Sequence, residues 1–408
     1  MVILEGKYNN CKVFTDTADK ATIAQITTFL DQESMKGSQI RIMPDCHAGK
    51  GCVVGTTMTV KDKVIPNVVG VDLGCGVLVT QLKEKRIDLP NLDSIVHKYV
   101  PNGFDKHKEA KADFDLSEVR ANINRDNALC SLGSLGGGNH FLEIDKDEEE
   151  NLYLVIHTGS RHLGLEVADY YQTLGYKKLA GRDPVSNSTY KQLRDILVPK
   201  LKEEGREAEI EEALRDLRKR LGLDEEVSIP FALAYVEGSD LDDYLNDVHI
   251  AQAYAKLNRQ TIAKIILKEA KLHAVDEFDT IHNYVDVEHK ILRKGAISAQ
   301  LGERVIIPMN MRDGSLICLG KGNPDWNYSA PHGAGRVMSR KEAKNQVSMR
   351  EFKDSMEGIY STSVVKDTRD EAPMVYKPMD EIVENIKDTV EIVKTIKPIY
   401  NFKAGGKD

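Results

Sequence analysis

The hydrophobic and polar positions divide the chain into three stretches with different periodicity. In the first third, short runs rich in β-branched residues are bounded by glycine or proline, which is typical of strands. We expect strands over Gln39–Met43, Val53–Val60, Val77–Leu82 and Leu152–Ile156, the first of them ending at Pro44. This part of the chain is therefore predicted to consist of short strands and loops.

The middle of the chain, residues 163–275, is dominated by helical periodicity. Within Ser239–Lys271, apolar residues spaced by four, three and three fall on one helical face, namely Leu241, Leu245, Val248 and Ala251. Ser239 with Asp242 three residues on predicts a capping box at the start of this helix. Lys200–Glu226, rich in Glu, Lys, Arg and Leu, indicates a solvated helical insertion, with a partner-binding arm as the alternative.

The last third returns to short strands around Arg304–Leu319, followed by a loop over Gly320–Arg336. Apolar residues spaced by three and four predict a helix over Met379–Lys394. No repeat or low-complexity linker divides the chain. We therefore expect an α+β fold with mixed sheets, as a single large domain over residues 1–408, with residues 163–275 as a helical excursion within it.

Composition and charge narrow the classes of protein. The 408 residues carry 56 Lys and Arg against 64 Asp and Glu, a net charge of −8, so any contact with nucleic acid needs a local basic groove. The six cysteines form no CxxC pair, which argues against a disulfide framework and against a zinc ribbon. No apolar run is long enough to cross a membrane, and we expect a cytoplasmic protein.

Histidines in glycine-rich loops carry most of the chemical signal. A lone buried histidine is more often a hydrogen-bonded core residue than a ligand, but the same context recurs several times here. The residues that share it are His47, His140, His157, His282 and His332, together with the Asp-x-x-Cys pair Asp72 and Cys75. Imidazole, thiolate and carboxylate together match a transition-metal site, and a thiolate can bridge two ions. Zinc, iron and manganese all remain open from these residues.

His332 stands apart from the other histidines because it lies between Pro331 and a Gly-Ala-Gly segment, with Arg336 and Arg340 following. Arginine binds phosphate oxygens in a bidentate manner. An imidazole beside a metal and arginines can act as a metal ligand, a general base or a nucleophile toward phosphorus. These three roles remain open from the residues alone.

These motifs, in this order, resemble those of the RtcB family of RNA-splicing ligases. The resemblance runs from about residue 39 to the end of the chain. The matching blocks are Pro44-Asp-Cys-His-Ala-Gly-Lys-Gly51, Gly70-Val-Asp-Leu-Gly-Cys-Gly76, Gly136-Gly-Gly-Asn-His-Phe-Leu-Glu143, His157-Thr-Gly-Ser-Arg161, His332-Gly-Ala-Gly-Arg336, and Lys403 after Asp370-Glu-Ala-Pro-Met-Val-Tyr376.

The resemblance implies a GTP- and manganese-dependent ligase that joins RNA 3′-phosphate or 2′,3′-cyclic phosphate ends to 5′-hydroxyl ends. It implies that His332 is the nucleophile that takes GMP and that Asp45 orients its ring. It also implies two Mn²⁺ ions, bridged by Cys75 and held by Asp72, Cys75, His140, His157 and His282. RNA with these ends would be the partner, and an archease-type activator is a further candidate.

The resemblance also implies the residues that would bind nucleotide and RNA. The expected nucleotide-binding residues are Asn139, Glu143, Ser315, Tyr376, Lys403 and Arg336. Arg161 and Arg340 are the expected contacts to RNA phosphate. The segment Pro308–Ser315 departs from the family's Pro-Gly-Ser-Met-Gly pattern, so the base pocket is expected to differ there.

Other functions remain as alternatives to ligation. A guanylyl-capping enzyme for 3′-phosphate ends and a metal-dependent phosphoesterase would use the same metal ligands, and capping would also need His332. A non-catalytic RNA-end binding protein is disfavoured, because every expected ligand and the nucleophile are present in the chain.

Overall fold

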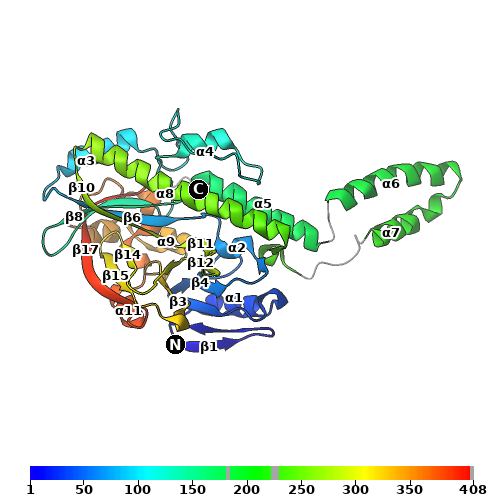
Figure 1. The fold of residues 1–408 in the computed structure, drawn as a ribbon, viewed down its shortest axis with the longest axis horizontal. Helices are drawn as coiled ribbons and strands as arrows, with labels where there is room; N and C mark the ends of the chain where they lie inside the picture. The colour runs from blue at the N-terminus through cyan, green and yellow to red at the C-terminus, as the bar shows by residue number, and fades with distance from the viewer. Residues whose placement is uncertain (181–183, 222–228, 405–408) are drawn as a thin grey trace.

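Two β-sheets with helices packed around them form the body of the protein (Figure 1). The structure, a computed structural model, describes residues 1–180, 184–221 and 229–404. In this part of the chain one sheet has seven strands and the other has six, with two additional strand pairs. The additional pairs join β13 (Ala296–Ser298) to β16 (Ser329–Pro331) and β5 (Lys63–Val64) to β9 (Val236–Glu237). Helices and sheets in one body confirm the α+β class expected from the sequence.

The seven-stranded sheet is antiparallel throughout. Its spatial order is β10 (Ala274–Ile281), β6 (Gly76–Leu82), β8 (Leu152–Thr158), β7 (Phe141–Lys146), β17 (Val390–Phe402), β15 (Gly314–Gly320) and β14 (Arg304–Asn310). One face is apolar because Leu78, Ile144 and Ile156 alternate with residues of the opposite face, and it packs on Ile262 and Ile266 of helix α8 (Ser239–Glu269).

The six-stranded sheet carries the N-terminal part of the chain. Its spatial order is β1 (Val2–Glu5), β2 (Asn10–Val13), β3 (Ile40–His47), β4 (Val54–Thr59), β12 (Ile291–Lys294) and β11 (Asn283–Asp286). β2 and β3 are parallel, and the other pairs are antiparallel. Because β10 leads into β11 through His282 alone, the two sheets meet at that residue.

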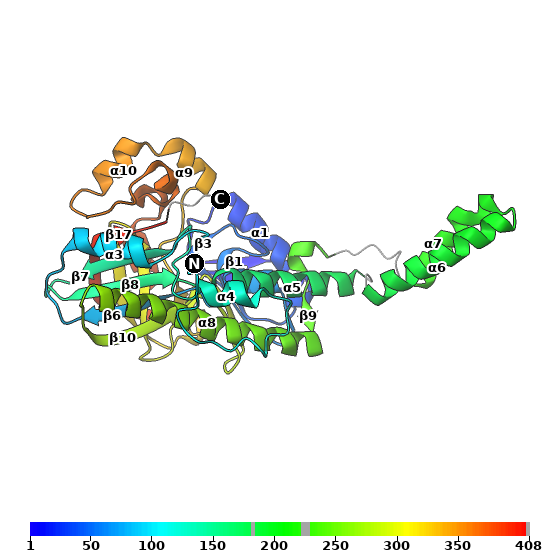
Figure 2. The ribbon, with the colours of Figure 1, turned by 90° about the horizontal axis from the view of Figure 1, so that it is seen from above.

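Helices cover the sheets and connect them. The helices of the body are α1 (Lys20–Leu30), α2 (Pro66–Val69), α3 (Leu89–Tyr99), α4 (Arg125–Ser131), α5 (Arg161–Leu179), α8, α9 (Arg340–Gln346), α10 (Met349–Ser355) and α11 (Met379–Asn385). α5 and α8 lie side by side, and α9 and α10 form a separate layer, seen at the top of Figure 2. Within the described residues, every helix is too short or too polar to span a bilayer.

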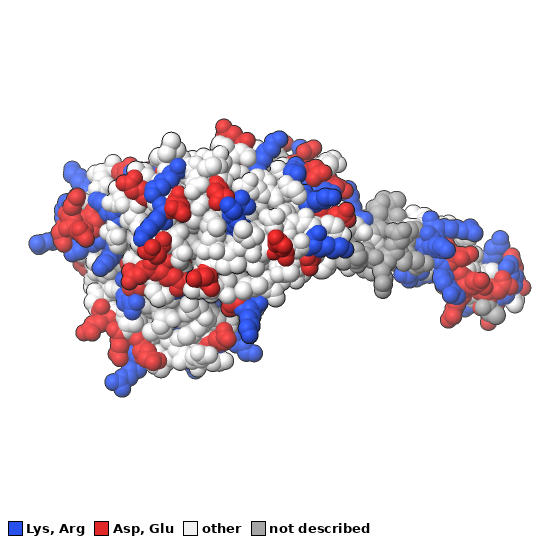
Figure 3. Space-filling model, turned by 90° about the horizontal axis from the view of Figure 1, so that it is seen from below, with Lys and Arg blue, Asp and Glu red and all other residues white. Residues whose placement is uncertain are grey.

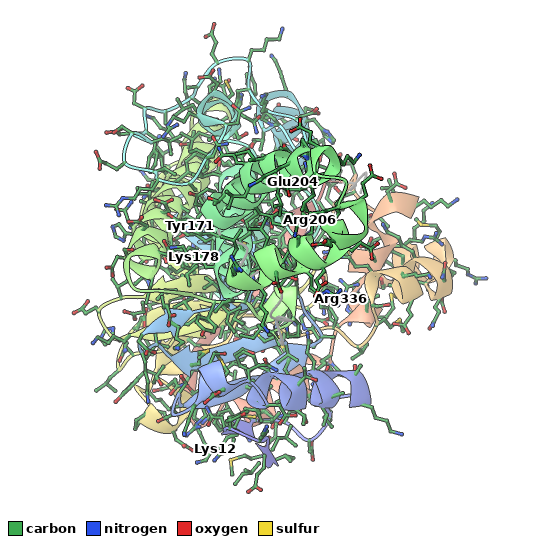
Figure 4. All side chains as sticks on the ribbon, turned by 90° about the vertical axis from the view of Figure 1, so that its right-hand side faces the viewer. Lys12, Tyr171, Lys178, Glu204, Arg206 and Arg336 are labelled. Carbon is green, nitrogen blue, oxygen red and sulfur yellow. The ribbon has the colours of Figure 1, made fainter. Side chains whose placement is uncertain are left out.

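Helices α6 (Pro184–Glu203) and α7 (Ile210–Arg220) form a hairpin that extends away from both sheets (Figures 1 and 2). Figure 4 looks along this hairpin and shows Glu204 and Arg206 at the turn between its helices. Arg206 donates a hydrogen bond to Glu204 over 3.0 Å, and Ile196 is 66% exposed. The end of α6 and the whole of α7 confirm the helical character predicted for Lys200–Glu226 in its described part, and residues 222–226 of that range lie outside it.

Two predicted boundaries are wrong. β3 does not end before Pro44 but continues to His47, because the pairing with β4 shifts register between Ile42 and His47 and leaves room for a proline. The predicted capping box is also absent. α8 begins at Ser239 itself, with Gly238 as its N-cap and no side-chain cap hydrogen bond.

The helix predicted over Met379–Lys394 is wrong in its second half. α11 ends at Asn385, and β17 begins at Val390. The run Val390–Ile396 contains four β-branched apolar residues, which favour a strand, and it pairs with β15 on one side while the end of the same strand pairs with β7. The apolar spacings of three and four that predicted a helix therefore continue into a strand that lies inside the sheet.

Candidate metal centre and nucleotide cavity

The expected metal ligands lie together at one end of four adjacent strands of the seven-stranded sheet. Cys75 directly precedes β6, His157 lies at the end of β8, and His282 directly follows β10. His140 directly precedes β7. Because these four strands are adjacent and antiparallel, alternating strand beginnings and ends bring the four side chains to the same edge.

The donor atoms of these side chains face one another. The Cys75 Sγ lies 3.4 Å from His140 Nε2 and 3.3 Å from His157 Nε2. His157 Nε2 lies 3.4 Å from His282 Nε2, and His140 Nε2 lies 2.9 Å from a carboxylate oxygen of Asp72. The donors form two groups, Cys75–His157–His282 and Asp72–Cys75–His140, and Cys75 belongs to both.

This donor set fits first-row transition metals. Ligand atoms held at 2.0–2.3 Å from one tetrahedral ion lie about 3.3–3.8 Å apart, which matches the sulfur–nitrogen and nitrogen–nitrogen distances found here. The sulfur common to both groups suits a bridging ligand. The donor set agrees with the metal site expected from the sequence, and the choice among zinc, iron and manganese is not made by these distances.

Burial sets the protonation of the histidine ligands. Burial lowers the pKa of His157 and of His282 well below the ordinary value, and the neighbouring histidines lower both further. Burial alone would raise the pKa of Asp72, but the hydrogen bond and charge of His140 bring it below its ordinary value. Neutral imidazoles beside an ionised carboxylate are the forms that bind a metal ion.

His332 lies beside this cluster, with its ring centroid 4.8 Å from that of His282. Its Nδ1 donates to a carboxylate oxygen of Asp45 over 2.6 Å, and its backbone N–H donates to the same oxygen over 3.2 Å. Asp45 is completely buried. The bond fixes the tautomer with the proton on Nδ1, which leaves the lone pair on Nε2.

Glycine at position 335 permits this arrangement. Its φ is +75°, and a Cβ there would lie 2.4 Å from the carbonyl oxygen of Asp45. Any side chain would therefore push the His332 loop away from β3, which carries Asp45. The Gly-Ala-Gly segment of the sequence thus serves the close approach of two backbones.

A cavity of about 380 Å³ opens onto the metal cluster and His332. The expected site residues that line it are Asp72, Cys75, Asn139, Glu143, His157, His282, His332, Arg336, Arg340, Tyr376 and Lys403. Its volume lies in the range of small-ligand sites. The structure therefore places most of the sequence-predicted residues around one space.

Glu371, which sequence analysis did not single out, contacts several cationic residues that line this cavity. It accepts hydrogen bonds from Tyr376 Oη over 2.5 Å, from Lys403 over 2.9 Å and from Arg336 over 3.3 Å. Arg340 lies 3.2 Å away. Burial alone would raise the pKa of Glu371, but these cations hold it below its ordinary value. Its position within the quoted Asp370–Tyr376 block was the only sequence signal.

Glu143 also lines the cavity and is the first of two buried carboxylates on β7. It is 3% exposed and accepts a hydrogen bond from the side chain of Asn401, and burial raises its pKa to about 7. Asp145, two residues further along β7, is completely buried, and neither carboxylate oxygen has a hydrogen-bond partner among the described residues. Burial, and then the charge of Glu143, raise the pKa of Asp145 well above its ordinary value.

Four expected site residues lie outside the cavity lining, among them Asp45, which contacts it through His332. His140 belongs to the donor cluster of Asp72 and Cys75. Arg161 donates to the carbonyl oxygen of Gly103 over 2.7 Å and to Ser134 Oγ over 3.1 Å, so it anchors two loops in this structure. Ser315 is completely buried on β15, and its hydroxyl has no partner within the described residues. The binding roles of Arg161 and Ser315 remain predictions.

Comparison with known proteins identifies relatives along nearly the whole chain. The family model described as tRNA-splicing ligase RtcB matches residues 33–127 and 110–404. The RNA-splicing ligase RtcB of Escherichia coli strain K12 is 30% identical over 410 residues, covering 89% of this chain and 90% of the relative. The RNA-splicing ligase RtcB2 of E. coli strain ATCC 25922 is 25% identical and covers 97% of each chain.

An archaeal relative matches over a similar span. The tRNA-splicing ligase RtcB of Aeropyrum pernix is 26% identical, covering 84% of this chain and 83% of the relative. The similarity therefore extends across bacteria and archaea, and the family match includes the whole seven-stranded sheet with the four strands that carry the candidate metal ligands.

Proposed function

The chain belongs to the RtcB family of RNA ligases, and from this premise we propose that it joins RNA 3′-phosphate or 2′,3′-cyclic phosphate ends to 5′-hydroxyl ends with GTP and manganese. The observation that carries the proposal is the position of His332. Its ring is oriented by the buried Asp45 and lies at one cavity wall with the donor cluster and a set of cations. The proposed nucleophile, the candidate metal ligands and the groups proposed to bind phosphate thus line one space.

His332 would act through Nε2, because Nδ1 keeps its proton toward Asp45. In the proposed first step Nε2 attacks the α-phosphorus of GTP. A P–N bond forms, the bond from the α-phosphorus to the bridging oxygen breaks, and pyrophosphate leaves with its electron pair. Asp45 stabilises the positive charge that develops on the ring.

The remaining steps transfer GMP and then release it. An oxygen of the RNA 3′-phosphate attacks the His332-bound phosphorus, which breaks the P–N bond and leaves the RNA end activated. The 5′-hydroxyl oxygen then attacks the 3′-phosphorus, a phosphodiester forms, GMP leaves, and the hydroxyl proton is released. A cyclic phosphate is hydrolysed to a 3′-phosphate first.

The other cavity residues would bind and orient these groups. Asp72, Cys75, His140, His157 and His282 would hold two Mn²⁺ ions, with Cys75 between them. Bound manganese would neutralise phosphate charge and polarise the phosphorus–oxygen bonds. Arg336 and Arg340 would bind phosphate oxygens, and Asn139 the α-phosphate. Glu143, Tyr376 and Lys403 would surround guanine, where an ionised Glu143 accepts hydrogen bonds from the base.

Labelling with GTP tests the proposal. The protein is incubated with α-labelled GTP and Mn²⁺, then with RNA that carries a 3′-phosphate and a 5′-hydroxyl, with and without an archease-type activator. We expect an acid-labile protein–GMP adduct followed by sealed RNA. His332→Ala should abolish the adduct. His289→Ala should retain it, because His289 is exposed and its bonds within the described residues are with Asp286.

Each other outcome names a different function. An adduct that yields only GMP-capped 3′ ends would indicate the capping enzyme. Phosphate release without an adduct would indicate a phosphoesterase. RNA binding with no response to GTP or metal would leave a non-catalytic RNA-end binder.

A further inference from the structure

Arg259 on α8 lies behind the metal cluster, on the side away from the cavity. Its side chain is completely buried, and it is not among the residues that line the cavity. α8 packs along β6 and β8, the strands that carry Cys75 and His157 at their ends (Figure 1). Arg259 therefore reaches the sheet edge from inside the protein, without a direct path to substrate.

The guanidinium of Arg259 bonds to the backbone beside two of the ligands. Nη1 donates to the carbonyl oxygen of Gly74 over 2.9 Å and to that of Thr158 over 2.8 Å. Gly74 directly precedes Cys75, and Thr158 directly follows His157. One nitrogen thus fixes the separation of the two backbone segments from which these ligands project.

The other side of the same guanidinium holds the strand of a third ligand. Nε and Nη2 donate to the two oxygens of Asp279 over 2.6 Å and 2.7 Å. Asp279 lies on β10, three residues before His282. The planar fork of arginine makes this bidentate contact and the two carbonyl contacts simultaneously, which the single ammonium of lysine cannot do.

Asn258, the residue before Arg259, makes similar contacts to the loop that leads to His140. Asn258 is also completely buried. Its side-chain oxygen accepts from the backbone N–H of Gly133 over 2.7 Å, and its amide donates to the carbonyl oxygen of Gly159 over 3.1 Å. These contacts tie the loop that leads to His140 to the loop that follows His157.

We propose that Arg259, paired with Asp279, is a positioning residue that sets the spacing of Cys75, His157 and His282 for metal binding. Its bonds to segments next to two ligands and to the strand of the third distinguish it from an arginine that only fills the core. The inference rests on the metal site of the proposed function, but not on the ligation reaction.

Cobalt binding tests the proposal without an activity assay. Co²⁺ is titrated into the purified protein, and the thiolate-to-cobalt and d–d absorption bands report affinity and ligand geometry. For Arg259→Lys we expect about a 10- to 100-fold loss of Co²⁺ affinity and altered bands, the range typical for groups that orient metal ligands. Thermal unfolding followed by circular dichroism establishes that the variant is folded.

Arg293 supplies a matched control. It is completely buried and bonds with Ser329 Oγ and Tyr284 Oη, but within the described residues it makes no hydrogen bond to a backbone group beside Cys75 or His157. Arg293→Lys should lose stability for the same reason as Arg259→Lys but keep the cobalt affinity and bands. An equal loss of cobalt affinity in both variants would overturn the proposal.

A second variant keeps the test decisive if Arg259→Lys does not fold. Asp279→Asn retains Arg259 and its carbonyl contacts but breaks the ion pair, so a smaller loss of affinity is expected. Unchanged cobalt affinity in Asp279→Asn, or in a folded Arg259→Lys, would overturn the positioning role. A wild-type protein that binds cobalt but forms no GMP adduct would instead refute the ligase proposal alone.

Discussion

Acidic side chains occupy alternate positions on β7 and just beyond it, and their surroundings differ sharply. Glu143 bonds with Asn401, Asp145 has no partner among the described residues, and Asp147 accepts from Lys394 and Tyr153. Asp145 and Asp147 are both buried, because β7 turns this face toward the apolar residues Val155 and Ile396.

The stability of the protein should depend on pH through Asp145. Its pKa is raised by burial, so the folded state holds a proton that the unfolded state releases above the ordinary aspartate range. The stabilisation from this proton is complete below the unfolded pKa and is lost as pH rises toward the folded pKa, by about 1.4 kcal/mol per pH unit. Asp145→Asn should remove this slope and be more stable than wild type at pH 8, measured by urea unfolding across pH.

Asp147 provides the opposite case two residues away. Although burial alone would raise its pKa, hydrogen bonds from Lys394, Asn151 and Tyr153 bring it below the ordinary value. Its stabilisation is present above the unfolded pKa and is lost as pH falls through the folded pKa. Asp147→Asn should therefore be less stable than wild type at neutral pH. The same pH slope in wild type and Asp145→Asn would contradict the role assigned to Asp145.

At the residue scale, sequence analysis identifies candidate site residues that lie in short, glycine-rich motifs. Cys75, His140, His157 and His332 were found because glycine surrounds each of them. Arg259 was missed because it lies in the middle of an ordinary helical pattern. Its partners are carbonyl oxygens at positions 74 and 158, and the sequence does not show which backbone groups a folded chain brings together.

At the scale of elements, β17 joins the part of the sheet that carries the candidate metal ligands to β15 and β14. It pairs with β7 on one side and β15 on the other, and Ile396 on it is completely buried. The sequence predicted β3, β4, β6 and β8 to within a few residues, because each is short and bounded by glycine or proline. It missed β1 and β2, and it wrongly predicted only strands and loops where α1 and α3 lie. It failed for β17 because the partners of a central strand come from distant positions, and its apolar spacing also fits a helix.

Truncation of β17 side chains should separate buried from exposed positions. Ile396→Ala removes apolar contacts from a closed interior, so we expect a loss of about 2–5 kcal/mol in the free energy of unfolding. Val393→Ala, on the same strand but 56% exposed, should change it by less than about 0.5 kcal/mol. Urea unfolding measures both, and equal losses would show that strand propensity, not burial, determines the stability of β17.

At the scale of the whole molecule, charge is distributed without a continuous basic surface on the face shown in Figure 3, where Lys and Arg alternate with Asp and Glu. The cationic groups that matter lie at the cavity wall, and two of them, Arg336 and Arg340, are themselves paired with acidic side chains. Under the proposed function, the net charge of −8 is compatible with RNA binding because these local cations would contact a few phosphates.

RNA affinity should consequently depend only weakly on salt. With a few phosphate contacts, the slope of the logarithm of the binding constant against the logarithm of salt concentration should be about −1 to −3 for single-stranded RNA. Arg340→Gln should make the slope shallower by about 0.7, the value for one contact. Fluorescence anisotropy with end-labelled RNA over a salt series measures this. A steep wild-type slope, or no change in Arg340→Gln, would contradict a local phosphate site at Arg340.

The placement of Cys75, His140, His157 and His282 at adjacent strand ends has a consequence for folding. A slip of one residue in the pairing of any of these strands would move its ligand by about 3.3 Å and turn neighbouring side chains to the opposite face. Only the correctly paired sheet assembles the donor atoms. Binding of a metal ion to these atoms would therefore select the native strand register, because it would stabilise the native pairing relative to every shifted one.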